Sequence, residues 1–267
     1  AAISGSGPAT VAALGLIMIP ALVKAGYPAA FSCALMAAGG AIGVVIPPSI
    51  TFVVYGSIAD ASITDLFKAG VIPGLLMGAG LIVAALVVGR KMDLKVLPKA
   101  TGKERWKAFK DAFWGLLMPV IILGGIYGSI FTPTEAAAVS VFYGLIVGIF
   151  VYREIDLKKI KDILIDSCST TATVMFITMG ATLFGYVLTR ARLDLAIESF
   201  MMNVTGGSTV IFFMIVNIVL LIAGCFLDST SALYIFPPLF APVALQLGID
   251  PIHLGTVMIV NLAIGLF

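Results

Sequence analysis

Charged residues are scarce in this sequence. Of its 267 residues, only 11% are Asp, Glu, Lys or Arg, whereas 60% are hydrophobic. Soluble domains carry about 25% charged residues, so this composition excludes a surface that faces water on all sides. It predicts an all-α polytopic membrane protein.

Histidine and cysteine are also scarce. The chain has one histidine, His253, and three cysteines at positions 33, 168 and 225, all in apolar segments. An odd, scattered set of cysteines argues against a disulfide framework or a metal site, and we expect these residues to be small core hydrophobes. Catalysis by a serine needs a base that activates it. With a single histidine, an intramembrane serine protease is only a remote alternative.

Apolar segments alternate with short turns, at 8–23, 29–46, 49–59, 63–89, 112–131, 136–152, 163–189, 209–227, 231–247 and 252–267. A helix needs about 20 residues to cross the hydrocarbon core. Three of these segments are long enough alone, namely 63–89, 112–131 and 163–189. The short or Pro- and Gly-interrupted ones predict re-entrant hairpins and discontinuous helices, which are tolerated where protein or a polar cavity shields the backbone.

Positive charge gathers in two stretches. Arg90 to Asp111 contains eight Lys or Arg against three acids, and a second cluster covers 153–161. The positive-inside rule places both stretches on the cytoplasmic side. Within 103–114, one helical face collects Trp106, Phe109 and Phe113. This pattern predicts an interfacial helix on the membrane surface, with a solvated linker as the alternative.

The chain contains an internal repeat at a shift of 222 positions. Residues 1–45 match 223–267 at seven positions, including Pro20 with Pro242, Gly26 with Gly248, and "AIG" at both ends. Both copies have the same order of polar turn, Pro-containing helix, Gly-containing turn and second apolar helix. Paired repeats with broken helices are typical of secondary transporters, whose sites form where the breaks meet. We expect the natural chain to continue beyond Phe267 with a Pro-Pro pair, and we expect the given sequence to be truncated at its start.

The first break lies in "AAGGAIGVVIPPSI" at 37–50. Because proline has no N–H, Pro47 frees the carbonyl of Gly43 and Pro48 frees that of Val44. The residue before a proline is pushed out of helical geometry, so Ile46 should be extended. Free carbonyls at a helix end suit a hard cation such as sodium. The alternative is a kink satisfied by a serine hydroxyl or by water.

Two polar turns accompany the breaks. The first is "SGSGP" at 4–8, and the second is "LDSTS" at 227–231. An ionisable residue between membrane helices, as Asp228 is, predicts a functional role, although an N-cap of the following helix is also compatible. Asn217 and Asn261 are interpreted as interhelical contacts or as site residues. "TPTE" at 132–135 predicts a capping box.

Several motifs in one order resemble the large membrane subunit of the tripartite ATP-independent periplasmic (TRAP) transporters over the whole chain. They are "ISGSGPATVAALGLIMIP", "AIGVVIPPSITFVVYG", "LFKAGVIPGLL", "FTPTEAAAV", "FLDSTSALYIFPPLFAP" and "LGIDPIHLGTVMIVNLAIGLF". The resemblance implies an inverted-repeat, elevator-type fold like that of the divalent anion–sodium symporters. It also implies sodium-driven import of an organic acid, such as a C4-dicarboxylate or sialic acid, across the bacterial inner membrane.

The resemblance implies further partners and two sodium sites. The partners are a small four-helix membrane subunit, a periplasmic substrate-binding protein and the lipid bilayer, with no nucleic acid. A related sodium-coupled carboxylate transporter without a binding protein is the alternative. The candidate sodium residues are Ser4, Ser6, Gly43, Val44, Ile46, Gly224, Asp228, Ser229 and Gly265. The weaker substrate candidates are Thr10, Ser49 and Asn261.

We expect four regions. Residues 1–89 form the first hairpin tip and broken helix of the transport domain, and 90–111 form a basic cytoplasmic or interfacial linker helix. Residues 112–208 form scaffold helices and the entry to the second repeat, and 209–267 form the second hairpin with the start of its broken helix. The protein is expected to be a transporter rather than an enzyme.

Overall fold

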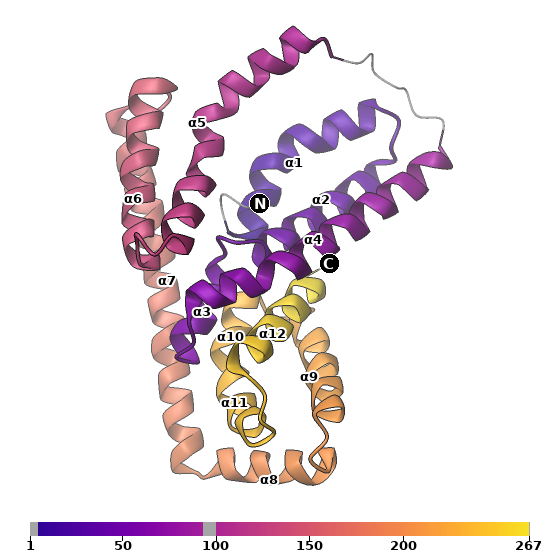
Figure 1. Cartoon of the computed structure of the whole chain (residues 1–267), viewed down its shortest axis with the longest axis vertical. Coiled ribbons are helices and arrows are strands. Elements are labelled where there is room, and N and C mark those ends of the chain that lie inside the picture. The colour runs from indigo at the N-terminus through magenta and orange to yellow at the C-terminus, as the bar shows by residue number, and fades with distance from the viewer. Residues whose placement is uncertain (1–4, 93–99, 267) are drawn as a thin grey trace. The chain divides into compact units, whose positions relative to one another are not determined.

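A computed structural model describes residues 5–92 and 100–266, and every regular element within these ranges is a helix (Figure 1). Five of the described helices are long and apolar enough to cross a membrane, or up to seven spans if two bent helix pairs are each counted as one. The prediction of an all-helical polytopic membrane protein is therefore confirmed. Ser4 and residues 93–99 of the expected linker lie outside the described residues.

The described residues of 1–97 and 181–267 form one compact unit, and those of 98–180 form a second. In chain order, the first unit contains α1 (Gly7–Lys24), α2 (Ala29–Val45), α3 (Ile50–Ile58), α4 (Ile63–Arg90), α8 (Leu193–Thr205), α9 (Thr209–Gly224), α10 (Ser229–Ile235), α11 (Pro237–Gln246) and α12 (Pro251–Gly265). The second unit contains α5 (Gly102–Tyr127), α6 (Pro133–Ile146) and the π-helix η1 (Val147–Val151). The long helix α7 (Leu157–Arg190) runs from the second unit into the first.

The core of the first unit lies around α12, which packs against α2, α3, α4 and α9. Its buried side chains include Leu254, Met258 and Ile259. In a lipid-exposed protein this concentration of buried residues in one short helix marks the centre of the unit. Segments from the two ends of the sequence therefore share one core.

Tyr55 joins α3 to the start of α12. Its side chain is fully buried, and its hydroxyl donates a 2.7 Å hydrogen bond to the carbonyl of Pro251. The ring lies against Gly255, where a Cβ would come within 2.2 Å of a ring carbon. Only a glycine at position 255 leaves room for this ring.

The proline break interrupts the first repeat where it was predicted. Helix α2 ends at Val45, Ile46 is extended with φ −75° and ψ 123°, and α3 begins at Ile50, bent by 41° from α2. The Pro47–Pro48 peptide bond is cis. The prediction of an extended Ile46 before the prolines is confirmed.

Helix boundaries correspond under the shift of 222 residues. Helix α1 starts at Gly7 and α10 at Ser229, and α2 starts at Ala29 and α12 at Pro251. The turns between them both contain a glycine with positive φ, 103° at Gly26 and 69° at Gly248. The order of turns inferred from sequence is therefore present in the helices, with one difference, because a break at Phe236 divides the second Pro-containing helix into α10 and α11.

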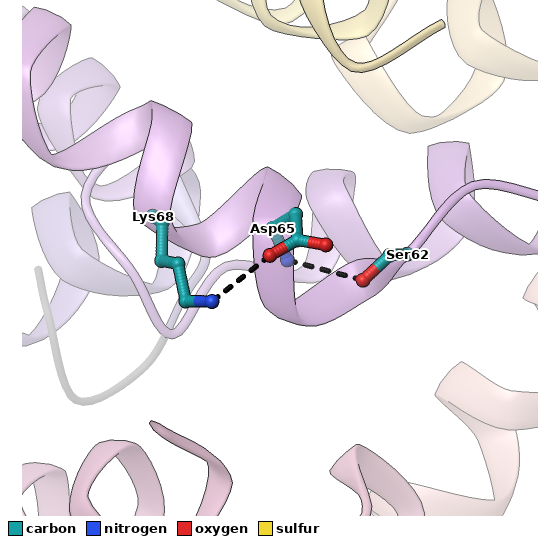
Figure 2. Close-up of polar contacts among 3 residues, drawn as sticks. All are labelled: Ser62, Asp65 and Lys68. Carbon is teal, nitrogen blue, oxygen red and sulfur yellow. Dashed lines mark hydrogen bonds and ion pairs between the residues drawn. The ribbon is translucent and has the colours of Figure 1, made fainter. Parts of the chain in front are cut away.

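Side-chain caps fix several helix starts. The capping box predicted at Thr132 and Glu135 is present at the start of α6, and a second one, not predicted, joins Thr101 and Glu104 at the start of α5. At the start of α4, Ser62 accepts a hydrogen bond from the backbone N–H of Asp65, whose carboxylate pairs with Lys68 at 2.9 Å (Figure 2).

The cysteines differ from the prediction. Cys33, Cys168 and Cys225 are free thiols, and all three are exposed in this chain. The interpretation of these residues as buried core hydrophobes is wrong. In apolar helices, position along the sequence does not reveal which face of the helix packs inward, and here the cysteines lie on outer faces.

Candidate functional site

A cavity of about 110 Å³ in the first unit brings the two polar turns together. Five separate stretches line it, with the residues Gly5, Ser6, Gly7, Pro8, Val44, Ile50, Thr51, Asp228, Ser229, Thr230 and Leu266. The volume has room for several waters or for a small, partly hydrated ion, since one water needs about 10–15 Å³ measured in this way.

The first turn lies directly on the proline break. The backbone carbonyl of Gly5 accepts a 3.4 Å hydrogen bond from the N–H of Ile50. Gly5 has φ +61°, and a Cβ there would lie 2.9 Å from the carbonyl oxygen of Pro48. Both the positive φ and the close approach require glycine.

Hydroxyl groups satisfy the carbonyl of Val44 that Pro48 frees. It accepts hydrogen bonds from Ser49 Oγ and, at 2.8 Å, from Thr51 Oγ1. The two hydroxyls also lie 2.8 Å apart, and both side chains are buried. At this one carbonyl the arrangement matches the alternative of a kink satisfied by a side chain, and it places two further oxygen atoms beside the break.

The second turn presents a carboxylate and a buried hydroxyl. Asp228 caps α10 by accepting hydrogen bonds from the N–H groups of Thr230 at 2.8 Å and Ser231 at 3.2 Å. It also accepts one from Ser231 Oγ at 2.5 Å. Ser229 is 5% exposed, and among the described residues its Oγ is the buried side-chain oxygen without a hydrogen-bond partner. An unsatisfied buried hydroxyl costs about 1–3 kcal/mol, so a ligand at this position gains from meeting it.

The chemistry of the lining favours a hard cation with oxygen ligands. Asp228 is the ionisable side chain in the lining, and the other polar side chains there are the hydroxyls of Ser6, Thr51, Ser229 and Thr230. Within residues 5–92 and 100–266, no three His, Cys, Asp or Glu side chains gather as they do in transition-metal sites. Neutral oxygens with one carboxylate suit a monovalent or divalent s-block ion better than zinc or iron.

The structure brings several predicted site residues to one place. Ser6, Val44, Asp228 and Ser229 line the cavity. Gly224 and Gly265 touch each other, since a Cβ on Gly265 would come within 2.8 Å of the Cα of Gly224.

Other predicted site residues lie outside the cavity lining. Gly43 is buried in the last turns of α2, and Ile46 packs its side chain against Gly74 of α4. The Thr10 hydroxyl donates to the carbonyl of Ser6 at 2.8 Å. Asn261 donates to Asn217 across α12 and α9, which is the interhelical contact considered for this pair.

Thr51 lines the cavity but was not predicted from the sequence, and Thr230 lies in the predicted polar turn but was not among the candidate site residues. Each stands within two residues of a predicted site residue, Ser49 and Ser229 respectively. In both cases the indication in the sequence was a cluster of hydroxyl side chains in the first turn of a helix.

Comparison with known proteins agrees with this architecture. The family model described as "Tripartite ATP-independent periplasmic transporter, DctM component" matches residues 1–267. The C4-dicarboxylate TRAP transporter large permease protein DctM of Pseudomonas aeruginosa is 47% identical over 100% of this chain and 62% of its own length. The isethionate TRAP transporter permease protein DctMQ of Oleidesulfovibrio alaskensis is also 47% identical, over 99% of this chain and 42% of its own.

A third relative is named for a different substrate. The sialic acid TRAP transporter large permease protein SiaM of Vibrio cholerae is 40% identical over 98% of this chain and 61% of its own length. The chain thus spans about three fifths of the length of these two large permease proteins. These relatives are transport proteins rather than enzymes. The chain belongs to the family of DctM components, the large permease proteins of the tripartite ATP-independent periplasmic transporters.

Proposed function

We propose that this chain carries out sodium-coupled import of a small organic anion as the large membrane subunit of a binding-protein-dependent transporter. The single observation that carries the proposal is the cavity in which the first turn, the proline break and the second turn meet around the buried hydroxyl of Ser229. Sodium coordinated there by carbonyl and hydroxyl oxygens holds the turns together.

The correspondence of helix boundaries supports an inverted-repeat, elevator-type arrangement. Helices α1 and α2 match α10 to α12 in length, order and intervening glycine turn. In transporters built from such repeats, the site forms where the two breaks meet. In an elevator-type arrangement, the mobile domain would carry this site across the bilayer. We infer two sodium sites, one at each helix break, in a protein of the inner membrane.

Coupling follows if the organic anion binds only after sodium has ordered the turns. A ligand shifts an equilibrium only by its differential affinity for the two states. Sodium bound between Asp228, Ser229 and the first turn favours the ordered state, and a substrate carboxylate then meets a site whose charge the ion has partly neutralised. The relatives named for C4-dicarboxylate, isethionate and sialic acid all carry small anions, which is consistent with this order.

Replacing Ser229 by alanine tests the site. We expect Ser229→Ala to raise the sodium concentration for half-maximal uptake about 10- to 150-fold, because a hydrogen bond to a charged group contributes about 1.5–3 kcal/mol. The measurement is uptake of a labelled organic anion into vesicles that contain the reconstituted transporter, at a series of sodium concentrations.

Ser57→Ala is the matched control, since the Ser57 hydroxyl is exposed and bonds within its own helix at 2.9 Å. It should leave the sodium dependence unchanged. If Ser229→Ala behaves like the control, Ser229 does not contribute to an ion site.

The partners are tested separately from the ion. We propose that the small membrane subunit and a periplasmic binding protein complete the system, so uptake should require the added binding protein. Uptake without it favours the alternative, a related sodium-coupled carboxylate transporter that acts alone. A thermal-shift panel of organic acids on the binding protein then identifies the substrate.

A further inference from the structure

The first half of α5, Gly102–Trp114, carries cations and aromatic rings that the transport site does not use. Its side chains from Gly102 to Phe113 are all exposed. The capping box between Thr101 and Glu104 fixes the start of this helix, with the N–H of Thr101 2.7 Å from Glu104 Oε2. The segment is therefore a well-defined helix that is exposed on all sides in this chain.

Spacing along the helix sorts its side chains into rows. Residues three and four positions apart lie on one side of a helix. One row contains Lys103, Lys107 and Lys110, and the row beside it contains Trp106, Phe109 and Phe113. Arg105 flanks the aromatic row on its other side. At 3.6 residues per turn, the acids Glu104 and Asp111 fall on the side opposite the aromatic rings.

Neighbouring rings of the aromatic row contact one another along the helix, and the last of them also contacts Trp114. Ring centroids are 5.7 Å apart between Trp106 and Phe109, 6.0 Å between Phe109 and Phe113, and 5.6 Å between Phe113 and Trp114. Trp106 is 60% exposed, and the ammonium of Lys110 lies 5.9 Å from the centre of its ring. A helix that lies in a headgroup layer turns its aromatic rings toward the acyl chains and keeps its cations at the level of the headgroups. The arrangement here fits this description, because the cations flank the rings and the acids lie on the opposite side.

A side-chain hydroxyl bonds the backbone of α5 where this segment ends. In a regular helix the N–H of Gly115 bonds the carbonyl of Asp111. Here the hydroxyl of Tyr152 bonds both groups, accepting from Gly115 at 3.2 Å and donating to Asp111 at 2.8 Å. Insertion of a side chain into the helical hydrogen-bond ladder is a known cause of kinks.

Two further groups weaken the same turn. Tyr143 donates a 2.7 Å hydrogen bond to the carbonyl of Trp114, and Pro119 has no N–H to bond the carbonyl of Gly115. The ribbon of α5 changes direction between its two halves (Figure 1). The first half can therefore lie along the membrane surface while the second half enters the bilayer.

We propose that Gly102–Trp114 lies in the headgroup layer and binds anionic phospholipids through Lys103, Arg105, Lys107 and Lys110. Charge complementarity selects this occupant, since the cations flank the rings and the acids point the other way. The positive-inside rule assigns the segment to the cytoplasmic leaflet. Each cation near an anionic surface strengthens binding by about fivefold.

Tryptophan fluorescence tests the proposal directly. Trp106 and Trp114 are the two tryptophans of the chain, and the difference between the protein and its Trp106→Phe variant isolates one of them. The protein is reconstituted in vesicles of phosphatidylcholine and phosphatidylglycerol, with bromine on the acyl chains of one lipid at a time. We expect brominated phosphatidylglycerol to quench Trp106 at least about twofold more than brominated phosphatidylcholine at equal amounts.

Substitution of the lysine row gives the decisive comparison. The triple variant Lys103→Gln, Lys107→Gln, Lys110→Gln should lose the preference for phosphatidylglycerol and still be quenched by both lipids. The control variant Lys158→Gln, Lys159→Gln, Lys161→Gln removes three cations from the second basic cluster. It should keep the preference for phosphatidylglycerol. Equal quenching by the two lipids in the unmodified protein overturns the proposal. So does an absence of quenching by either lipid, because another protein surface then covers the segment.

Discussion

Gly224 and Gly265 let helices α9 and α12 touch through their backbones. A Cβ on Gly224 would lie 3.0 Å from the Cα of Gly265, and backbone cannot move aside as a flexible side chain can. We expect Gly224→Ala to separate the helices and to destabilise the protein by about 1–3 kcal/mol, as overpacking does. Thermal unfolding of the purified protein in detergent measures this as a lower Tm.

Gly78→Ala is the matched control. Gly78 also lies inside an apolar helix, α4, but a Cβ there meets nothing within 4 Å. Its Tm should be unchanged or slightly higher, because alanine favours a helix over glycine. A Gly224→Ala protein as stable as this control contradicts the inferred backbone contact.

At the residue scale, the sequence predicts which polar groups are left without a helical hydrogen bond better than it predicts which groups they then bond. The freed carbonyl of Val44 follows from the position of Pro48 alone, because proline cannot donate a hydrogen bond. Its acceptance of the Ser49 and Thr51 hydroxyls depends on the direction in which α3 leaves the break. Likewise, Ser229 was identified from its polar turn, but its lack of a partner depends on the packing around it.

At the scale of the element, the bonds of Tyr152 to the backbone of α5 lead to a second prediction. Tyr152→Phe removes the hydroxyl that bonds both Asp111 and Gly115, so these backbone groups keep only their helical partners and the helix should straighten. Spin labels at positions 105 and 124 report this by pulsed electron resonance. A straight helix places them about 28 Å apart, 19 residues at 1.5 Å each, and we expect Tyr152→Phe to move the distance up toward this value.

Tyr127→Phe serves as the control, because Tyr127 lies at the far end of the same helix. It should leave the distance between the labels unchanged. A bend that persists in Tyr152→Phe assigns the change of direction to Pro119 rather than to the inserted hydroxyl.

Element boundaries were largely predictable because turn chemistry is local. The capping box of α6, the break after Val45 and the glycine turns at 26 and 248 all follow from residues within a few positions of one another. The hydrogen bonds between Tyr152 and the backbone of α5 were not predictable, since Tyr152 lies 37 residues beyond Gly115. For the same reason the aromatic segment at 103–114 was expected as a separate interfacial helix, whereas it is the first part of one helix that continues to Tyr127.

At the scale of the whole molecule, a site shared by both ends of the chain leads to a thermodynamic prediction. If sodium raises the affinity for the organic anion by a given factor, the anion must raise the affinity for sodium by the same factor. We expect a factor of about 5–150, the usual range of coupling between sites. Calorimetric titration of each ligand in the presence and absence of the other measures both factors, and a factor of one would show that the two ligands bind without coupling.

The grouping of distant segments into one unit was only partly predictable from sequence. The repeat at a shift of 222 residues pairs the two turns, and the cavity contains both of them. The expected region 112–208 is divided between the two units. Its residues 181–208 lie in the same compact unit as the segments from the two ends of the chain. Apolar helices in lipid resemble one another in composition, so hydropathy does not reveal which of them pack together.

The contact between Tyr55 and Gly255 limits how this family can vary. Because a Cβ at position 255 would come within 2.2 Å of the ring, a larger residue there is compatible only with a smaller one at position 55. Substitution of Gly255 alone is therefore excluded, and the two positions should change as a pair. Relatives with alanine or serine at the position of Gly255 should lack an aromatic residue at the position of Tyr55, so this pair, 200 residues apart in the chain, becomes a covariation signal.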